Sequence, residues 1–265
     1  MGDWPMRLIT ALRSAVYMVF LVVTVIPYAT AVLAWSWLPQ ERRYWLTIGW
    51  PRLAIWGARW ICGIRWRVQG WDNLPPEPAI LLPKHQSAWE TLWLPSHMPR
   101  KLSFVYKREL HRVPFFGWAF ATLGMINIDR SQGQSAFEQV VDQGNEHLHD
   151  GWWIVIFPEG TRTPPGSNRR YKTGGVRLAV RTGVPVVPIA LNSGECWPRK
   201  AFLKKPGEIT VSIGTPIPTV GCTDRDIATL VESWIETEMR RLAPHRYAGP
   251  YEATPPAEAE SDEHT

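Results

Sequence analysis

The feature that most constrains the fold is a stretch of 27 consecutive residues without a charge, from residue 14 to residue 40. Its core, residues 15–38, consists mainly of Val, Leu, Ala and aromatic residues. As an α-helix rising about 1.5 Å per residue, this core reaches roughly 36 Å, and the hydrocarbon layer of a membrane is about 30 Å thick. The stretch therefore predicts a membrane-anchoring helix, beside which the rest of the chain must fold.

A cleaved signal peptide is the competing interpretation of this stretch. Its apolar region spans only about 7–15 residues and ends at a small-residue cleavage site, so the longer run favours a membrane helix. Pro27 lies near the middle of the run. We expect it either to kink the helix or to convert it into a hairpin-like element that enters only part of the bilayer.

Arginines and tryptophans alternate in the next segment, residues 42–67. Nine of the 16 tryptophans lie within the first 71 residues. This distribution predicts an interfacial helix, with indole rings at the headgroup level and arginines near anionic phosphates. A Trp-rich core helix is the alternative. The residues concerned are Arg42, Arg43, Trp45, Trp50, Arg52, Trp56, Arg59, Trp60, Arg65, Trp66 and Arg67.

The position of the basic residues also predicts an orientation in the membrane. They cluster after the apolar run, so the positive-inside rule places the remainder of the chain on the cytoplasmic side of the inner cell membrane. Arg7 and Arg13, which precede the run, count against this orientation.

Charge and cysteine content narrow the class of partner. The net charge is +5, but residues 248–265 hold five acids and no Lys or Arg, which leaves 29 basic against 19 acidic residues, or +10, elsewhere. A basic body suits an anionic partner. Without a zinc-finger or RNP pattern, lipid is favoured over nucleic acid. The widely spaced cysteines, Cys62, Cys196 and Cys222, predict neither a disulfide framework nor a metal site.

Apolar periodicity beyond residue 64 predicts alternating strands and helices. This alternation indicates an α/β fold with a mixed, largely parallel sheet flanked by helices. We assign residues 1–64 to the membrane anchor, 65–245 to one catalytic domain and 246–265 to a disordered acidic tail. The predicted strands are residues 65–69, 79–82, 102–106, 125–128, 153–157, 186–191 and 209–213, and the clearest helices are 88–98, 135–150, 175–182 and 224–242.

Residues 81–90 (LLPKHQSAWE) place His85 and Glu90 five residues apart at the end of a predicted strand. If Ser87 caps a helix that begins near Ala88, the carboxylate in the first helical turn can fold back toward His85. Such a contact would fix the imidazole tautomer and stabilise the protonated ring of a general base. The chain has no G-x-S-x-G nucleophile motif, so the attacking hydroxyl is assigned to the substrate. A satisfied surface histidine is the alternative.

Residues 154–162 (IVIFPEGTR) form a second block, in which an apolar strand runs into a turn that carries Glu159 and Arg162. Turn-forming residues beside a solvated ion pair are the simpler interpretation. However, His85, Lys107, Arg130 and Glu159 all follow predicted strands directly. In open α/β sheets ligands bind at that edge. We therefore expect these segments to converge on one cleft.

The segment 163–172 is rich in Pro, Gly, Ser, Asn and Arg, as a loop is. It ends at Lys172, just before a predicted helix that begins near Gly175. A helix start beside a lysine can receive a phosphate group. For Arg169 and Arg170, a solvated basic loop is an equal alternative.

Together these blocks resemble the glycerophospholipid acyltransferase family, whose hallmark is an H-x4-D motif followed by an F-P-E-G-T-R-like motif. Residues 106–110 (YKREL), 114–117 (PFFG) and 126–130 (INIDR) resemble the family's second motif region, and 184–193 (VPVVPIALNS) its fourth motif. The resemblance covers roughly residues 65–220 and looks closest to the 1-acylglycerol-3-phosphate acyltransferases, which make phosphatidic acid. One departure is Glu90, where the family usually has Asp, so either the local turn or the approach of the carboxylate to His85 differs.

The resemblance implies that His85 removes the proton from the free hydroxyl of a lysophosphatidic acid while that oxygen attacks an acyl thioester. Glu90 would steady the imidazolium. The donor would be acyl-CoA or acyl carrier protein, with no cofactor, and the enzyme would work at the lipid bilayer. Glu159 would organise its turn or contact the acceptor glycerol, and donors near Gly160 or in the turns of the motifs would stabilise the oxyanion. The substrate-binding residues implied are Lys107, Arg130, Glu159, Gly160, Thr161, Arg162 and Lys172.

Three other functions stay open on the sequence. The acceptor could be a different lyso-lipid, the protein could be a membrane-bound hydrolase that uses His85 to activate water, or it could bind lipid without catalysis.

Overall fold

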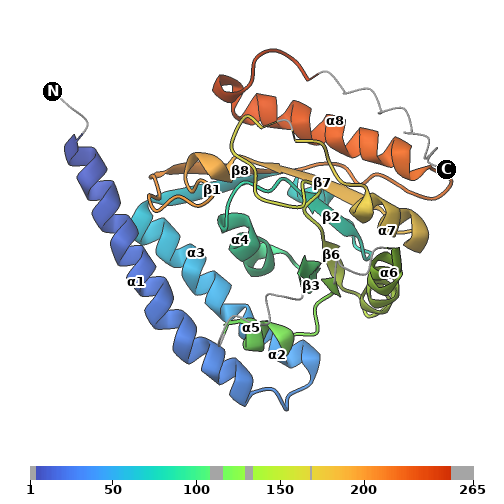
Figure 1. Cartoon of the computed structure of the whole chain (residues 1–265), viewed down its shortest axis with the longest axis horizontal. Helices are drawn as coiled ribbons and strands as arrows, with labels where there is room; N and C mark the ends of the chain where they lie inside the picture. Colours follow the sequence, from blue (N-terminus) through green and yellow to red (C-terminus); the bar gives the residue numbers. More distant parts are fainter. Residues whose placement is uncertain (1–3, 108–115, 129–133, 168, 252–265) are drawn as a thin grey trace, which may run out of the picture.

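The computed structural model describes residues 4–107, 116–128, 134–167 and 169–251. Its centre is a six-stranded sheet between two layers of helices (Figure 1). Two further short strands, β4 (Tyr106–Lys107) and β5 (Asn127–Ile128), pair with each other in a separate sheet. In chain order the strands of the central sheet are β1 (Ile64–Gln69), β2 (Ile80–Pro83), β3 (Leu102–Phe104), β6 (Trp153–Val155), β7 (Val186–Leu191) and β8 (Gly207–Ile213).

The central sheet has the strand order β1-β8-β7-β2-β6-β3. Neighbouring strands run parallel except for β7 and β8, which are antiparallel. The predicted mixed, largely parallel sheet is confirmed. The α-helices are α1 (Trp4–Ala34), α2 (Gln40–Thr47), α3 (Gly49–Cys62), α4 (Trp89–His97), α5 (Phe116–Ala121), α6 (Gln134–His149), α7 (Gly174–Thr182) and α8 (Asp224–Leu242), with short 3-10 turns at Trp71–Asn73, Ser193–Glu195 and Pro244–Arg246.

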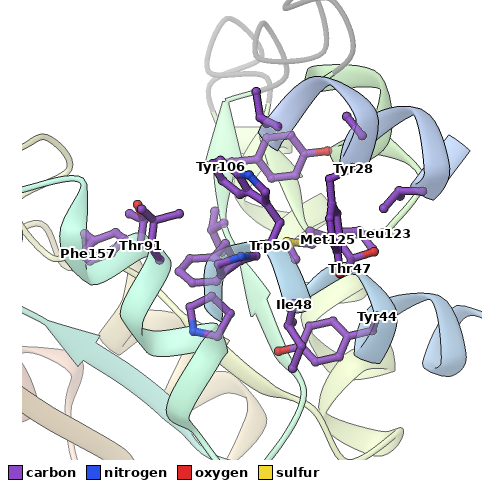
Figure 2. A pocket seen from close by; sticks show the side chains of 18 of the residues that line it. Tyr28, Tyr44, Thr47, Ile48, Trp50, Thr91, Tyr106, Leu123, Met125 and Phe157 are labelled. Atoms are coloured by element: carbon purple, nitrogen blue, oxygen red, sulfur yellow. The ribbon is translucent and has the colours of Figure 1, made fainter. Parts of the chain in front are cut away.

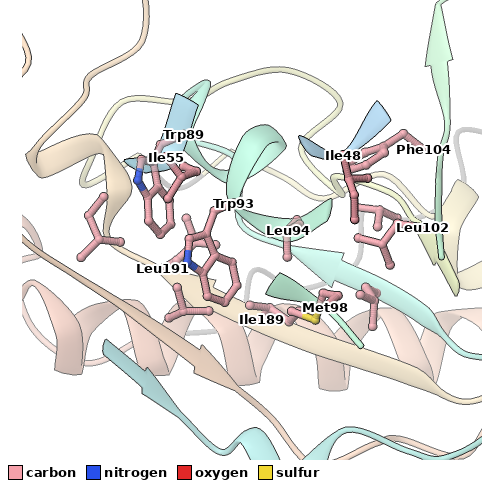
Figure 3. Close-up of a cluster of buried hydrophobic side chains, with 14 of the residues drawn as sticks. Ile48, Ile55, Trp89, Trp93, Leu94, Met98, Leu102, Phe104, Ile189 and Leu191 are labelled. Atoms are coloured by element: carbon pink, nitrogen blue, oxygen red, sulfur yellow. The ribbon is translucent and has the colours of Figure 1, made fainter. Parts of the chain in front are cut away.

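Side chains of β2 alternate between the two hydrophobic layers, as strand geometry requires. Leu81 packs in the layer of α3 and α4, where Trp89 and Trp93 stack on each other (Figure 3). Ile80 and Leu82 face the opposite layer, which α6, α7 and α8 cover. Because both faces are covered, β2 is apolar throughout and fully buried. Its carboxyl end is therefore fixed at the centre of the sheet.

The N-terminal helices pack on the domain that we predicted for residues 65–245 and share its core. Helix α1 lies along α3 (Figure 1), where the Tyr17 hydroxyl donates to the Ala54 carbonyl at 2.9 Å. The Tyr44 hydroxyl of α2 accepts the N–H of Leu102 at 2.9 Å. The segment 1–64, which we predicted as an anchor, thus also supports the fold of residues 65–245.

The hairpin considered for Pro27 does not form, since α1 is one helix from Trp4 to Ala34. Pro27 removes only the hydrogen bond that its own N–H would donate to Val23, and Val23 lies on the exposed side of α1. The single interfacial helix predicted for residues 42–67 is also wrong. Helix α3 ends at Cys62, and Gly63, with φ of 73°, turns the chain into β1.

The start of the predicted tail contacts the domain. Arg246 pairs with Glu195 at 2.7 Å, and the Tyr251 hydroxyl donates to Glu232 at 3.0 Å. Residues 252–265, which hold the acids of the predicted tail, lie outside the described residues.

Candidate active site

The turn after β2 carries His85, as predicted. β2 runs parallel to both of its neighbours, β6 and β7, so the carboxyl ends of the three strands meet at one edge of the sheet. The chain then turns into α4. The capping residue of that helix is Ala88, one residue later than expected, while the Ser87 hydroxyl accepts the N–H of Trp89 at 3.0 Å. His85 therefore sits between the end of a buried strand and a capped helix.

Glu90 folds back over the first turn of α4 and contacts the imidazole. Its Oε1 lies 3.0 Å from Nδ1 of His85 and accepts the N–H groups of Gln86 at 2.7 Å and Ser87 at 2.6 Å. Its Oε2 accepts the hydroxyl of Ser193 at 2.8 Å. Because the carboxylate is surrounded by donors, this network assigns the proton of the neutral ring to Nδ1. The lone pair of the ring then lies on Nε2, as a general base requires.

The longer side chain of Glu90 explains how glutamate serves where the family usually has aspartate. It reaches two main-chain N–H groups before its own helix as well as the imidazole. Ser193, which the sequence interpretation missed, holds the other oxygen from the end of β7. The only sequence signal for Ser193 is its place at the end of the 184–193 motif.

Phe157 fixes the plane of the imidazole. The two rings stack with centroids 3.8 Å apart and an interplanar angle of 18°. Phe157 follows β6 and opens the Phe-Pro-Glu-Gly turn, which makes that turn a wall of the histidine site. The His85 side chain keeps 12% of its surface exposed, so solvent and substrate can reach it. The role of Phe157 was also missed from the sequence.

The same turn holds the main chain of His85 on both sides. The N–H of His85 donates to Oε1 of Glu159 at 3.1 Å, and its carbonyl accepts the N–H of Thr163 at 2.7 Å. Glu159 is fully buried and lies 3.4 Å from Nζ of Lys84. This placement favours the turn-organising role of Glu159 over a contact with the acceptor.

Gly160 permits the close approach of Lys172. Its φ is 66°, and a Cβ at this position would lie 3.0 Å from Cδ of Lys172. An alanine would therefore be strained and would displace the lysine. The N–H of Gly160 already donates to the carbonyl of Phe157 at 3.0 Å, so it is not free for an oxyanion. The next N–H along the turn belongs to Thr161, which is half-buried.

The cationic residues that we predicted to bind phosphate differ in burial and in their distance from the described site. Arg162 is half-buried and lines the same cavity as His85, and its Nε is buried with no hydrogen-bond partner among the described residues. Lys172 is exposed beside Gly160. The backbone of Lys107 lies in β4, and the strand predicted for residues 102–106 divides into β3 and β4. Arg130 lies outside the described residues.

An apolar cavity of about 380 Å³ connects the histidine to the N-terminal helices. Both His85 and Arg162 line it, and its walls include side chains of α1, α2, α3 and α4. In Figure 2, Phe157 and Thr91 lie at one end, while Tyr28, Tyr44 and Thr47 lie at the other. Within the part of the chain described, no three His, Cys, Asp or Glu side chains gather as metal ligands would.

Known proteins with similar sequences are acyltransferases, in agreement with the His85–Glu90 geometry. A family model described as acyltransferase matches residues 65–192. The 1-acyl-sn-glycerol-3-phosphate acyltransferase of Pseudomonas aeruginosa is 46% identical over 78% of this chain and 82% of its own length. The human 1-acyl-sn-glycerol-3-phosphate acyltransferase alpha is 31% identical over 68% of this chain, and the match spans 65% of the human protein, just under two thirds.

The fold is also found in a solved structure. The crystal structure of the 1-acyl-sn-glycerophosphate acyltransferase of Thermotoga maritima superposes with a TM-score of 0.72, covering 87% of this chain and 95% of that one, at 22% identity. At this identity the likeness shows the fold alone. With the family model and the 46% identical relative, the chain therefore belongs to the 1-acyl-sn-glycerol-3-phosphate acyltransferase family.

Proposed function

We propose that the protein transfers a fatty acyl group from an acyl thioester to the sn-2 hydroxyl of a 1-acylglycerol 3-phosphate, which gives phosphatidic acid. The observation that carries this proposal is the His85–Glu90 pair, in which Nδ1 lies 3.0 Å from Glu90 and Nε2 has no hydrogen-bond partner among the described residues. The names of the relatives support the same acceptor.

In the proposed reaction, Nε2 of His85 takes the proton of the acceptor hydroxyl as its oxygen attacks the thioester carbonyl carbon. The C–O bond forms, the C–S bond breaks, and the imidazolium returns the proton to the leaving thiolate. Glu90 stabilises the transient positive charge of the ring. The N–H of Thr161 is the donor we propose for the oxyanion. The donor is acyl-CoA or acyl carrier protein.

Arg162 and Lys172 are the cations that we propose for the acceptor phosphate, together with Lys107 and Arg130. Arg162 has the strongest support, because it lines the same cavity as His85 and its Nε is buried and unpartnered among the described residues. A planar guanidinium suits bidentate contact with a phosphate group. The apolar cavity accommodates an acyl chain.

Arg162→Gln is expected to raise the KM for lysophosphatidic acid by about 10-fold or more, because charge-assisted hydrogen bonds contribute roughly 1.5–3 kcal/mol each. The kcat should stay near that of the wild type. Steady-state kinetics with varied acceptor measure both values. Arg169→Gln is the matched control, since Arg169 is exposed on the same loop. An equal rise in KM for both variants would remove Arg162 from the phosphate site.

We further propose that α1 enters the bilayer together with α3, on the cytoplasmic side of the inner membrane. α1 is long and apolar enough to cross a membrane by length and composition, and only 17% of its most apolar window is buried. On its other side, Tyr17 and Thr24 of α1 form hydrogen bonds with α3, and Tyr28 forms one with α2. Its exposed large apolar side chains are Trp4, Met6, Leu8, Ile9, Leu12, Val16, Met18, Val19, Val22, Val23 and Ile26.

The paired substitution Val19→Asp with Val23→Asp is expected to weaken binding to anionic liposomes by at least about tenfold. Both side chains are exposed on α1, at 62% and 63%, and burying one valine is worth roughly 1.5–3 kcal/mol. Liposome flotation measures the effect. Val220→Asp is the control, since Val220 is 79% exposed beside α7 in the other helical layer. Unchanged flotation of the α1 variant would exclude this face as the membrane contact.

The proposed function is tested by comparing acceptors. The purified protein with an acyl thioester should acylate lysophosphatidic acid and should use a monoacylglycerol, which lacks the phosphate, far less well. Equal use of the two acceptors would contradict the proposed substrate. Release of free fatty acid at a rate that the acceptor does not change would instead identify a hydrolase.

A further inference from the structure

Lys84, the residue before His85, has no direct place in the reaction above, yet its side chain is fully buried. A buried ammonium is costly unless opposite charges surround it. Its Nζ lies 2.5 Å from Oε1 of Glu236 and 3.4 Å from Oε1 of Glu159, and 3.3 Å from the hydroxyl of Tyr171. The lysine therefore joins two buried carboxylates that come from different parts of the chain.

These contacts tie α8 to the segments of the active site. Glu236 lies on α8, where Arg240 also pairs with it at 3.3 Å, and it accepts the hydroxyl of Tyr171 at 2.9 Å. Tyr171 precedes Lys172, and Glu159 belongs to the turn that holds the backbone of His85. Two cations, Lys84 and Arg240, thus face two carboxylates in a buried cluster directly behind the histidine.

We infer that Lys84 is a positioning residue for the acyl transfer reaction: its ammonium keeps Glu159 ionised, so that this carboxylate can hold the N–H of His85. The inference rests on the proposed function of His85. Lys84 touches neither substrate in this scheme and acts only through Glu159. Its second carboxylate contact, to Glu236, fixes the ammonium against α8.

The electrostatic balance at Glu159 supports this role. Burial raises the pKa of Glu159, and the nearby ammonium of Lys84 is the largest influence that opposes the rise, followed by the N–H of His85. Oε2 of Glu159 is buried and has no hydrogen-bond partner among the described residues. Without Lys84, the carboxyl group would keep only two main-chain donors among the described residues, the N–H groups of His85 and of Glu159 itself, and its pKa would rise further.

Further titratable groups of the described chain lie near this cluster: Glu232 faces Tyr171, and Tyr251 faces Glu236. Tyr247, which follows α8, faces Lys84 and Glu236 electrostatically, and Tyr171 is kept neutral because burial raises its pKa well above the ordinary value. The imidazole of His85 is the remaining group that faces Glu159.

The test uses a charge-balanced variant, Lys84→Met with Glu236→Gln, so that Glu236 on α8 is not left as a buried carboxylate without the ammonium of Lys84. In this variant Glu159 stays in place without its ammonium. A second variant adds Glu159→Gln, whose amide oxygen can accept the His85 N–H at every pH. The readouts are the pH profile of kcat and the pH dependence of thermal unfolding.

For the charge-balanced variant we expect kcat at neutral pH to fall by about 10²-fold, as misplacement of a catalytic group does, with KM for the acceptor near the wild-type value. The acid limb of the kcat profile should move about 1–3 pH units higher, because loss of a neighbouring opposite charge raises a carboxyl pKa by that amount. In the variant that also carries Glu159→Gln, the limb should return toward its wild-type position, since residue 159 no longer titrates.

The pH dependence of the unfolding temperature tests the effect of Lys84 on Glu159 without an activity measurement. A carboxyl group whose pKa is raised in the folded state costs stability as the pH rises from its unfolded pKa, about 4.3, toward the raised value. The charge-balanced variant should therefore lose stability over this range relative to the variant with Glu159→Gln.

An acid limb that stays at the wild-type position in the charge-balanced variant would overturn the inference, as would parallel unfolding profiles for the two variants. Absence of acyl transfer in the wild type would instead refute the proposed function. The unfolding profiles would then still decide whether Lys84 controls Glu159.

Discussion

His85→Ala is expected to lower kcat for acyl transfer by about 10²–10⁴-fold, the range that general base catalysis contributes. The KM for lysophosphatidic acid should change little, because the proposed phosphate contacts come from Arg162 and Lys172. Glu90, 3.0 Å from Nδ1, fixes the tautomer of the imidazole for proton transfer. The stacked Phe157 ring, with its centroid 3.8 Å away, fixes the plane of the imidazole. Kinetics with both substrates varied measure the two parameters.

The matched control for this variant is His147→Ala. His147 is also held by a hydrogen bond, to the Gly124 carbonyl at 2.8 Å, and by stacking on Trp152 at 5.2 Å, but it lies on α6 and does not line the cavity. Its kcat should stay near that of the wild type. A His85→Ala enzyme that turns over within tenfold of the wild type would remove the histidine from the role of base.

Glu90→Gln is expected to lower kcat by about 10²-fold. The amide oxygen can still accept the N–H groups of Gln86 and Ser87, which lie 2.7 Å and 2.6 Å from Oε1 in the wild type. The neutral amide cannot stabilise the imidazolium, however, and hydrogen bonds to charged groups are worth roughly 1.5–3 kcal/mol. The loss should therefore appear in kcat, with the fold and the acceptor KM preserved.

Glu90→Asp supplies the control, because it keeps the charge and introduces the residue that the family usually carries. We expect it to retain more activity than Glu90→Gln, although the shorter side chain cannot reach all the donors around Oε1. Thermal unfolding of both variants checks that the fold stays stable when the carboxylate that accepts the Ser193 hydroxyl is changed. If the glutamine variant were as active as the aspartate variant, the charge of Glu90 would have no part in catalysis.

Much of the sheet could be predicted because its strands have continuous apolar patterns. The predicted bounds of β7, Val186–Leu191, and of α8, Asp224–Leu242, agree with the structure. The start of α8 is marked by Thr223, whose hydroxyl accepts the N–H of Asp226. The strand predicted for residues 102–106 divides because the chain changes partner. The N–H of Val105 bonds to Val155, whereas the N–H of Tyr106 bonds to Ile126. Such a change depends on tertiary contacts.

The candidate site shows the same division. The pairing of His85 with Glu90 could be predicted, because both residues lie within one strand–turn–helix segment and local geometry brings them together. Ser193 could not, since it reaches Glu90 from 103 positions further along the chain. The burial of Glu159 with Lys84 was likewise invisible, because a turn residue beside an arginine predicts a solvated ion pair. Lys84 also pairs with Glu236 of α8, 152 positions further along the chain, so these internal charges depend on tertiary packing.

The N-terminal segment was predicted from hydropathy, which does not distinguish a helix surrounded by lipid from one with a single lipid-facing side. The Ser14 hydroxyl of α1 accepts the N–H of Lys204 at 2.9 Å, and Tyr17 stacks edge-on against Trp197. These polar and aromatic positions interrupt the apolar run at the contact with the domain. They explain why one side of α1 is buried although the run contains no charge.

The most direct measurement of the central claim follows a labelled acyl chain from a thioester, with detergent-purified wild type and His85→Ala assayed in parallel. We expect the wild type to place the label in phosphatidic acid only when lysophosphatidic acid is present, and we expect His85→Ala to form almost none. Equal phosphatidic acid formation by both proteins would contradict His85 as the base. Label that the wild type releases only as free fatty acid, whether or not the acceptor is present, would contradict acyl transfer itself.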